Sequence, residues 1–200
     1  MAIQRDSILI VDLEATCWPG YSAPEGQHNE IIEIGACLLD WQTGSVRAPR
    51  SYLVQPIESE VSEFCTALTS ITPQILSEAG MAFASACERL EQEFAAHSRI
   101  WASWGAFDRT LFLKQCKRRQ QPYPFSKKHI NLKRLVQDAS GQRLGLARAM
   151  EHYGVSAEGT AHRGVDDAVN TARLLAQVIA VHGVEILRRH GLLYEPDKQS

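Results

Sequence analysis

An apolar run that closes on two acids constrains this chain more than any other feature. Residues 8–11 read Ile-Leu-Ile-Val, and Asp12-Leu13-Glu14 follow at once. Such a run predicts a buried strand, and the two-residue repeat of a strand places both carboxylates on one face at its end. Carboxylates on one face repel each other, and a hard divalent cation between them offsets that repulsion. The alternative is a solvated pair at a sheet edge, because Asp-x-Glu alone is a weak motif.

Length and composition predict one compact, soluble domain. The chain has 200 residues, of which 44% are hydrophobic, enough for a sizeable core. No stretch approaches the roughly 18 apolar residues of a membrane span, and residues 1–6 lack the pattern of a secretory signal. We therefore expect an intracellular, cytoplasmic protein with no membrane contact. The five scattered cysteines show neither disulfide nor zinc spacing, which predicts reduced thiols; they are Cys17, Cys37, Cys65, Cys87 and Cys116.

Charge is strongly separated along the chain although the net charge is only −2. Residues 1–65 hold ten acids and three bases, whereas residues 109–134 hold nine bases and no acid. A basic segment beside an acidic, metal-binding one favours contact with a nucleic acid. The alternative is a solvated helix face followed by a loop.

Periodicity and turn residues predict an α/β domain with a mixed sheet. A Pro- and Gly-rich loop is expected over residues 18–29, beside the acidic pair, and short amphipathic pieces over 62–76. The further strands are expected at 30–39, 50–54 and 99–103, and the helices at 81–96, 107–120, 144–153 and from about residue 165 onward. A polar tail is expected from residue 195.

A second acid stands where a short strand turns into a helix. Asp108 closes the segment Trp-Ala-Ser-Trp-Gly-Ala-Phe-Asp over residues 101–108. Helix N-termini favour acids, so Asp108 could serve only the cap or the helix dipole. Helical spacing, however, aligns it with Leu111, Phe112 and Gln115 on a face expected to turn inward. A buried acid on that face favours a cation partner.

A third segment opens the last long helix with a histidine and two aspartates. At about 100° per residue, Asp166 shares a wholly polar stripe with Asn170. Asp167 instead lies beside the apolar arc that meets the core. We therefore expect Asp167 to be functional and Asp166 to be solvated. His162 alone fits a surface or capping histidine equally well.

These segments resemble the Asp-Glu-Asp-Asp 3′-to-5′ exonucleases of the subgroup with a His-x₄-Asp third motif. Asp12 and Glu14 match the first motif, Asp108 the second, and His162 with Asp167 the third. The similarity is greatest to the exoribonucleases that trim histone mRNA and small RNAs, and to their bacterial relatives. It covers about residues 6–182, leaving 183–200 as an extension that packs on the domain or frays from it. The loop at 18–29 departs from the family.

The resemblance implies a ribonuclease-H-like fold with a mixed five-stranded sheet and helices on both faces. It also implies two Mg²⁺ or Mn²⁺ ions per active site. Asp12 would bridge the ions, Glu14 and Asp167 would complete the site for the nucleophile's metal, and Asp108 would support the second. His162 would act as a general base, for which its imidazole must be neutral.

The resemblance also suggests where the terminal nucleotide lies. Residues after the first motif line its pocket in the family, which points to Ala15 and Thr16, with backbone amides near the 3′-hydroxyl. Ile71 fits either a wedge against a base or an ordinary core residue.

Three aromatic residues offer stacking surfaces for unpaired bases. Trp18, in its polar loop, is the favoured candidate. Phe107 is a second one, whereas Trp104 is better explained as a core residue.

The expected activity is release of 5′-mononucleotides from a single-stranded 3′ end, with RNA favoured over DNA. One alternative is a DNA exonuclease of the proofreading or repair type. Another is a catalytically idle nucleic-acid-binding module that retains the fold. The oligomeric state cannot be inferred from the pattern.

Overall fold

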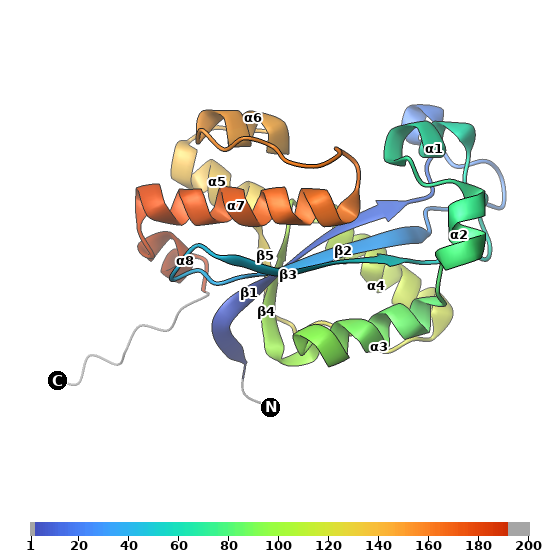
Figure 1. Cartoon of the computed structure of the whole chain (residues 1–200), viewed down its shortest axis with the longest axis horizontal. Helices are drawn as coiled ribbons and strands as arrows, with labels where there is room; N and C mark the ends of the chain where they lie inside the picture. Colours follow the sequence, from blue (N-terminus) through green and yellow to red (C-terminus); the bar gives the residue numbers. More distant parts are fainter. Residues whose placement is uncertain (1–2, 192–200) are drawn as a thin grey trace.

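The strand that carries the acidic pair lies at the centre of a five-stranded sheet. The computed structural model describes residues 3–191, and its strand order is β3-β2-β1-β4-β5 (Figure 1). β1 pairs antiparallel with β2 and parallel with β4; β2–β3 is antiparallel and β4–β5 parallel. The predicted mixed sheet is confirmed. The strands are β1 (Gln4–Ala15), β2 (Ile31–Leu39), β3 (Val46–Leu53), β4 (Arg99–Ser103) and β5 (His129–Asn131).

Helices cover both faces of the sheet, as predicted. Alternate residues of β1 enter different cores: Ile8 and Ile10 pack with residues of α5 to α8, whereas Leu9 and Val11 pack with residues of α3 and α4. The helices are α1 (Glu63–Thr69), α2 (Pro73–Ala79), α3 (Phe83–Phe94), α4 (Phe107–Arg119), α5 (Leu132–Ser140), α6 (Leu146–His152), α7 (Gly164–His182) and α8 (Glu185–Arg189), with short 3₁₀ turns at Pro19–Tyr21 and Ala96–Ser98.

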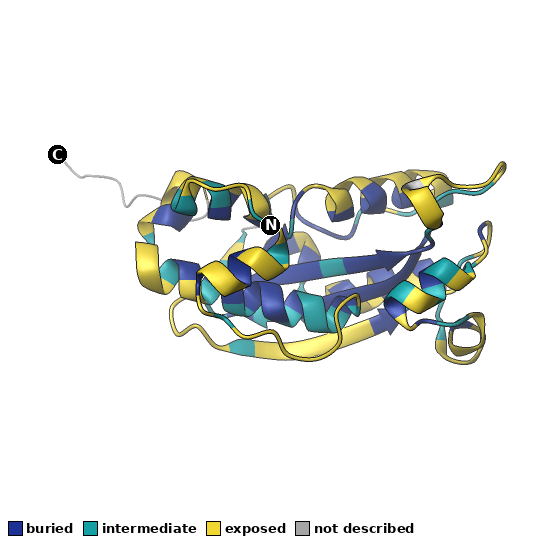
Figure 2. Ribbon diagram, turned by 90° about the horizontal axis from the view of Figure 1, so that it is seen from above, coloured by how far each residue is buried: buried dark blue, intermediate teal, exposed yellow. Residues whose placement is uncertain are grey.

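The edge elements differ most from the sequence-based prediction. β3 begins at Val46 rather than at residue 50, and most of its side chains are exposed (Figure 2). β5 and α5 were not predicted, because a three-residue strand inside a basic segment lacks an apolar run. β5 instead exists through its pairing with β4.

The start of α2 follows local capping rules. The side chain of Thr72 accepts a hydrogen bond from Ile75 N–H, and Pro73 occupies the first turn. This start divides the short amphipathic pieces predicted over residues 62–76.

Two glycines let α7 approach the sheet far more closely than side chains would allow. A Cβ on Gly35 of β2 would lie 1.9 Å from the Gly164 carbonyl carbon and 2.3 Å from Val165 N. Gly35 pairs with Asp12 across β1 and β2. The missing side chain therefore brings the first turn of α7 beside the acidic end of β1.

Residues 183–191 pack on the same domain. Ile186 and Leu187 of α8 are buried in the core cluster that contains α7. The tail predicted from residue 195 lies outside the described residues. Within residues 3–191, no helix has both the length and the apolar character needed to cross a bilayer.

Candidate active site

The five motif residues line one pocket at the carboxyl end of β1. The pocket has a volume of about 520 Å³, and its walls come from the end of β1, the first turn of α4, α6, and the loop and first turn of α7. Segments some 150 residues apart thus meet in one cavity. The motif residues that line it are Asp12, Glu14, Asp108, His162 and Asp167.

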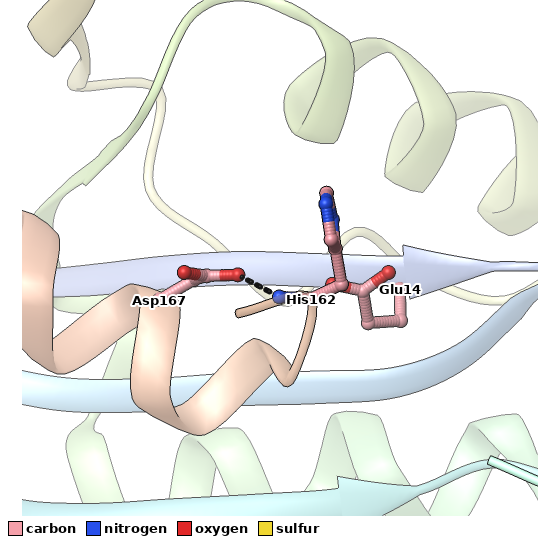
Figure 3. Close-up of side chains that lie close together, drawn as sticks. All are labelled: Glu14, His162 and Asp167. Carbon is pink, nitrogen blue, oxygen red and sulfur yellow. Dashed lines mark hydrogen bonds between the residues drawn. The ribbon is translucent and has the colours of Figure 1, made fainter. Parts of the chain in front are cut away.

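Three of these side chains can hold a metal ion between them. One ligand atom each from Glu14, His162 and Asp167 lies within 4.8 Å of the others (Figure 3). Glu14 is buried and Asp167 half-buried, whereas His162 is exposed at the rim. Carboxylate oxygens are the ligands that Mg²⁺ and Mn²⁺ prefer, so the donor set fits the implied cations.

Asp108 is held in place by β1 rather than by its own helix end. Its side chain is 5% exposed, and its Oδ1 accepts a hydrogen bond from Leu13 N at 3.1 Å. The N-cap of α4 is Ala106, with no side-chain cap. Asp108 therefore links the second motif directly to the first, which a capping role alone does not explain.

The loop before α7 fixes His162 through an unusual backbone conformation. His162 has φ of 60°, a left-handed value that is uncommon outside glycine. Its N–H donates to Asp167 Oδ2 at 2.8 Å. The Asp167 carboxylate therefore fixes the backbone of His162. Asp166 accepts instead from Thr160 N at 2.9 Å and does not line the pocket, as predicted. It is half-buried rather than solvated, however, and Asn170 of the same stripe is buried and does line the pocket.

Glu33 is a positioning residue that the sequence reasoning missed. It pairs with Glu14 across the β1–β2 ladder, is fully buried, and accepts from Gly164 N at 3.0 Å. Its carboxylate also pairs with Arg163 at 3.1 Å and accepts from Ser51 Oγ. Glu33 thus ties β2 to the start of α7. A charge inside the apolar run 31–39 was the available signal.

The acids of the pocket hold protons far more tightly than solvated carboxyls. Burial and then repulsion from Asp108 and Glu14 raise the pKa of Asp12 well above its usual value. Burial and Asp167 raise the pKa of Glu14 to about 8, and burial raises the pKa of Asp108 to about 6. Burial also raises the pKa of Asp167. Because a cation would reverse these shifts, the cluster has the electrostatics of a metal site.

Metal-free protein is expected to lose stability as the pH rises from about 7 to about 8. In this window folded Glu14, with its pKa near 8, keeps a proton that the unfolded chain has released, so the slope is negative. Burial lowers the pKa of His28, His129 and His190, which gives an opposite slope, but only below about 6.5. Thermal melts in EDTA measure the effect.

Adding Mg²⁺ should remove most of this loss, since the ion takes the place of the bound proton. Glu14→Gln serves as the control, because it removes the titrating carboxyl and should flatten the slope in EDTA. Equal melting temperatures at both ends of the window in EDTA would contradict the carboxylate cluster.

A family comparison places these residues in a known class of enzyme. The RNase_T family model, described as "Exonuclease", matches residues 9–175 and so spans all five motif residues. The chain belongs to this exonuclease family. The match begins inside β1 and ends inside α7, the two elements that carry three of the four acids.

The relatives of this exonuclease carry names of the same kind. It is 30% identical to "3'-5' exonuclease Snipper" of Drosophila melanogaster, over 90% of this chain and 72% of that protein. It is also 30% identical to "ERI1 exoribonuclease 2" of Xenopus laevis, over 86% of this chain but 28% of that protein. The chain therefore spans most of one relative and little more than a quarter of the other.

A solved structure supports the ribonuclease-H-like fold and the family assignment. The exonuclease matches the nuclease domain of 3'hExo, described as a DEDDh family member bound to rAMP. The TM-score is 0.81 at 27% identity, over 92% of this chain and 96% of that one. The DEDDh assignment made from five residues is confirmed.

The expectation for Thr16 needs correction. Its backbone N–H donates to Glu30 O at 2.8 Å, and its Oγ1 donates to His28 O and accepts from Glu30 N. The amide of Thr16 is therefore committed to the loop and does not point to a 3′-hydroxyl. Ala15 is buried at the end of β1 and does not line the active-site pocket, so its place beside the terminal nucleotide stays a prediction.

Two further substrate contacts predicted for the exonuclease do not fit the structure. Trp18 is 7% exposed, so the favoured stacking candidate is buried despite its polar loop. Ile71 is 1% exposed and packs with Ile32 and Leu76, which makes it a core residue. The preference for Trp18 was wrong because sequence neighbours do not reveal side-chain direction, whereas for Ile71 the structure favours the core alternative that the sequence had left open.

Phe107 and Trp104 line the active-site pocket instead. Phe107 is 57% exposed at the start of α4, as a stacking residue requires. Trp104 packs partly on the core but also faces the pocket, so its core interpretation was incomplete.

The basic segment 109–134 does not form one continuous surface. Arg118 and Arg119 of α4 pair with Glu58, and Arg119 also pairs with the buried Glu30. These guanidinium groups hold the loop at 57–59, whose amides also donate to Glu30. Lys114 and the lysine and arginine of α5 line separate hollows, so nucleic-acid contact by this segment stays a prediction for only some of its members.

Proposed function

We propose that this exonuclease removes 5′-mononucleotides from the 3′ end of single-stranded RNA, using two Mg²⁺ or Mn²⁺ ions. The observation that carries the proposal is the convergence of four carboxylates and one imidazole in a single pocket. A binding module has no need for acids whose protons are so strongly retained without a cation.

The position of each residue in the pocket suggests its role in the reaction. Asp12, Glu14, Asp108 and Asp167 would hold the cations, which supply an activated water and stabilise the leaving 3′-oxygen when bound. The imidazole of His162 stands at the solvent rim, where a ring nitrogen can take the proton of the attacking water and release it to solvent. Asp167 fixes the backbone of His162, so the base and the metal ligands share one orientation.

Two observations support RNA as the substrate. The Xenopus relative is named an exoribonuclease, and the 3'hExo domain was captured with rAMP. A cytoplasmic location belongs to the same proposal, because all five cysteines are free thiols, as expected in a reducing compartment.

Digestion of 5′-labelled RNA and DNA oligonucleotides of one sequence tests the proposal. With Mg²⁺ or Mn²⁺, the RNA should shorten stepwise from the 3′ end and release 5′-mononucleotides, and EDTA should stop the reaction. DNA should shorten at least about tenfold more slowly, which is about 1.4 kcal/mol in transition-state free energy. A 3′-phosphate strand serves as the control for end recognition.

The alternatives give different outcomes in the same assay. Faster digestion of the DNA strand would favour the proofreading or repair type of exonuclease. Binding of either strand without metal-dependent release of mononucleotides would identify an idle binding module.

A further inference from the structure

A second hollow adjoins the active-site pocket and shares Phe107 with it. This hollow, here called the α4 pocket, has a volume of about 190 Å³ and lies between α4 and the loop at residues 28–29. The residues of α4 that line it include Phe107, Leu111, Lys114 and Arg118. They follow helical spacing, so the pocket extends along one stripe of α4, away from Asp108.

The walls of the α4 pocket match the flat ring of a base. Phe107, more than half exposed, lines both this pocket and the active-site pocket, so its ring is within reach of a base in either one. Leu111 adds apolar surface. A volume of 190 Å³ is below that of a pocket for a drug-sized ligand and suits one ring system. Stacking on an aromatic side chain is the usual means of holding unpaired bases.

Two amide side chains offer the pocket one hydrogen-bond donor and one acceptor in fixed orientations. Gln115 Oε1 accepts from Ile31 N at 2.8 Å, which leaves the Nε2 donor of Gln115 available. Asn29 Nδ2 donates to Thr16 O at 2.6 Å, which leaves the Oδ1 acceptor of Asn29 available. Their backbone partners fix both amide orientations. A base edge, which carries donors and acceptors side by side, complements such a pair.

One cation of the pocket is available for a phosphate. His28 and Arg118 both lie beside Glu58, at 3.5 and 3.6 Å. Lys114 has no ion pair within the described part of the chain and is exposed. It lies seven residues, about 10 Å, along the helix from Phe107. Lys114 therefore lies about two turns of α4 further along the helix than Phe107.

We propose that the α4 pocket binds the base next to the 3′-terminal nucleotide. The terminal base then lies on the active-site side of Phe107 and its neighbour on the other side. Gln115 and Asn29 contact the edge of the second base, and Lys114 contacts a phosphate further from the end. This inference rests on the proposed exonuclease function and adds the path and the recognition of the second nucleotide.

Single abasic substitutions in the strand test the proposal. Removal of the second base from the 3′ end should lower kcat/KM for release of the first nucleotide about tenfold, the loss expected for one stacked base. Removal of the third base should change kcat/KM by less than about twofold. Equal values for the intact strand and the strand abasic at position two would overturn the inference.

Two variants connect this discrimination to the pocket. Gln115→Glu keeps an acceptor for Ile31 N but removes the donor, so the ratio between intact and abasic strands should fall from about ten to about two. Lys114→Met should lower kcat/KM on the intact strand about fivefold by removing a phosphate contact. Lys117→Met makes the same charge change on α4 outside the pocket and should stay within about twofold of the unmodified protein.

Two results separate this inference from the proposed function. The p-nitrophenyl ester of uridine 5′-monophosphate lacks a second base, so its metal-dependent hydrolysis by the unmodified protein reports the chemistry alone. If neither this ester nor any strand is cleaved, the proposed function fails, and this inference with it. If strands are cleaved but Lys133→Met, on α5, has the effect expected of Lys114→Met, the strand leaves over α5 and only the α4 pocket is refuted.

Discussion

Asp12→Asn is expected to lower kcat on single-stranded RNA by about a thousandfold or more. Loss of a carboxylate that would hold the proposed cations removes several kcal/mol of transition-state stabilisation, and each 1.4 kcal/mol is about a factor of ten. The same change should raise the melting temperature of the metal-free protein, because folding raises the pKa of Asp12 and so costs free energy at neutral pH, a cost that the neutral asparagine does not carry. Single-turnover kinetics and thermal melts in EDTA measure the two effects.

This opposite movement of activity and stability distinguishes a metal ligand from a structural residue. Damage to the fold would lower both quantities. Asp166→Asn is the matched control: it lies next to Asp167 but contacts Thr160 N, an acceptor role that asparagine retains. Its kcat should stay within about threefold of the unmodified protein. A fully active Asp12→Asn protein would refute the assignment of the pocket as the catalytic centre.

The parts of the site that follow from periodicity could be predicted from the sequence. The two-residue repeat of β1 places Asp12 and Glu14 on the face that meets α7. The helical repeat of α7 separates Asp167, which lines the pocket, from Asp166, which does not. Both are local rules, and each acts within a single element.

The parts that depend on contacts between elements could not be predicted in this way. Glu33 acquires its role only because α7 begins against β2, where Gly164 N and Arg163 reach its carboxylate. Trp18 lies in a loop of polar neighbours and is nonetheless buried. β5 forms only because β4 offers it an edge. In each case the deciding partner is remote in sequence.

The close contact of Gly35 with Gly164 also joins elements that are remote in sequence. A substitution that disrupts this contact should strongly reduce both stability and activity. In Gly35→Ala the new methyl group meets backbone atoms of Gly164 and Val165 at 1.9 to 2.3 Å, which no rotamer change relieves. Overpacking of this type costs about 1–3 kcal/mol, so the melting temperature should fall. If α7 moves by about 1 Å, kcat/KM should fall about a hundredfold, because Asp167 and His162 move with it.

Two other glycines turn this prediction into a graded series. A Cβ at Gly164 would come within 3.0 Å of Gly35 N and 3.2 Å of Asp12 O, a milder conflict, whereas a Cβ at Gly145 meets nothing within 4 Å. Activity and melting temperature should therefore decrease in the order Gly145→Ala, Gly164→Ala, Gly35→Ala. Calorimetric Mg²⁺ affinity should follow the same order, since Asp167 is carried by α7. If Gly35→Ala retained full activity, the close approach of α7 to β2 could not be what brings the third motif to the first.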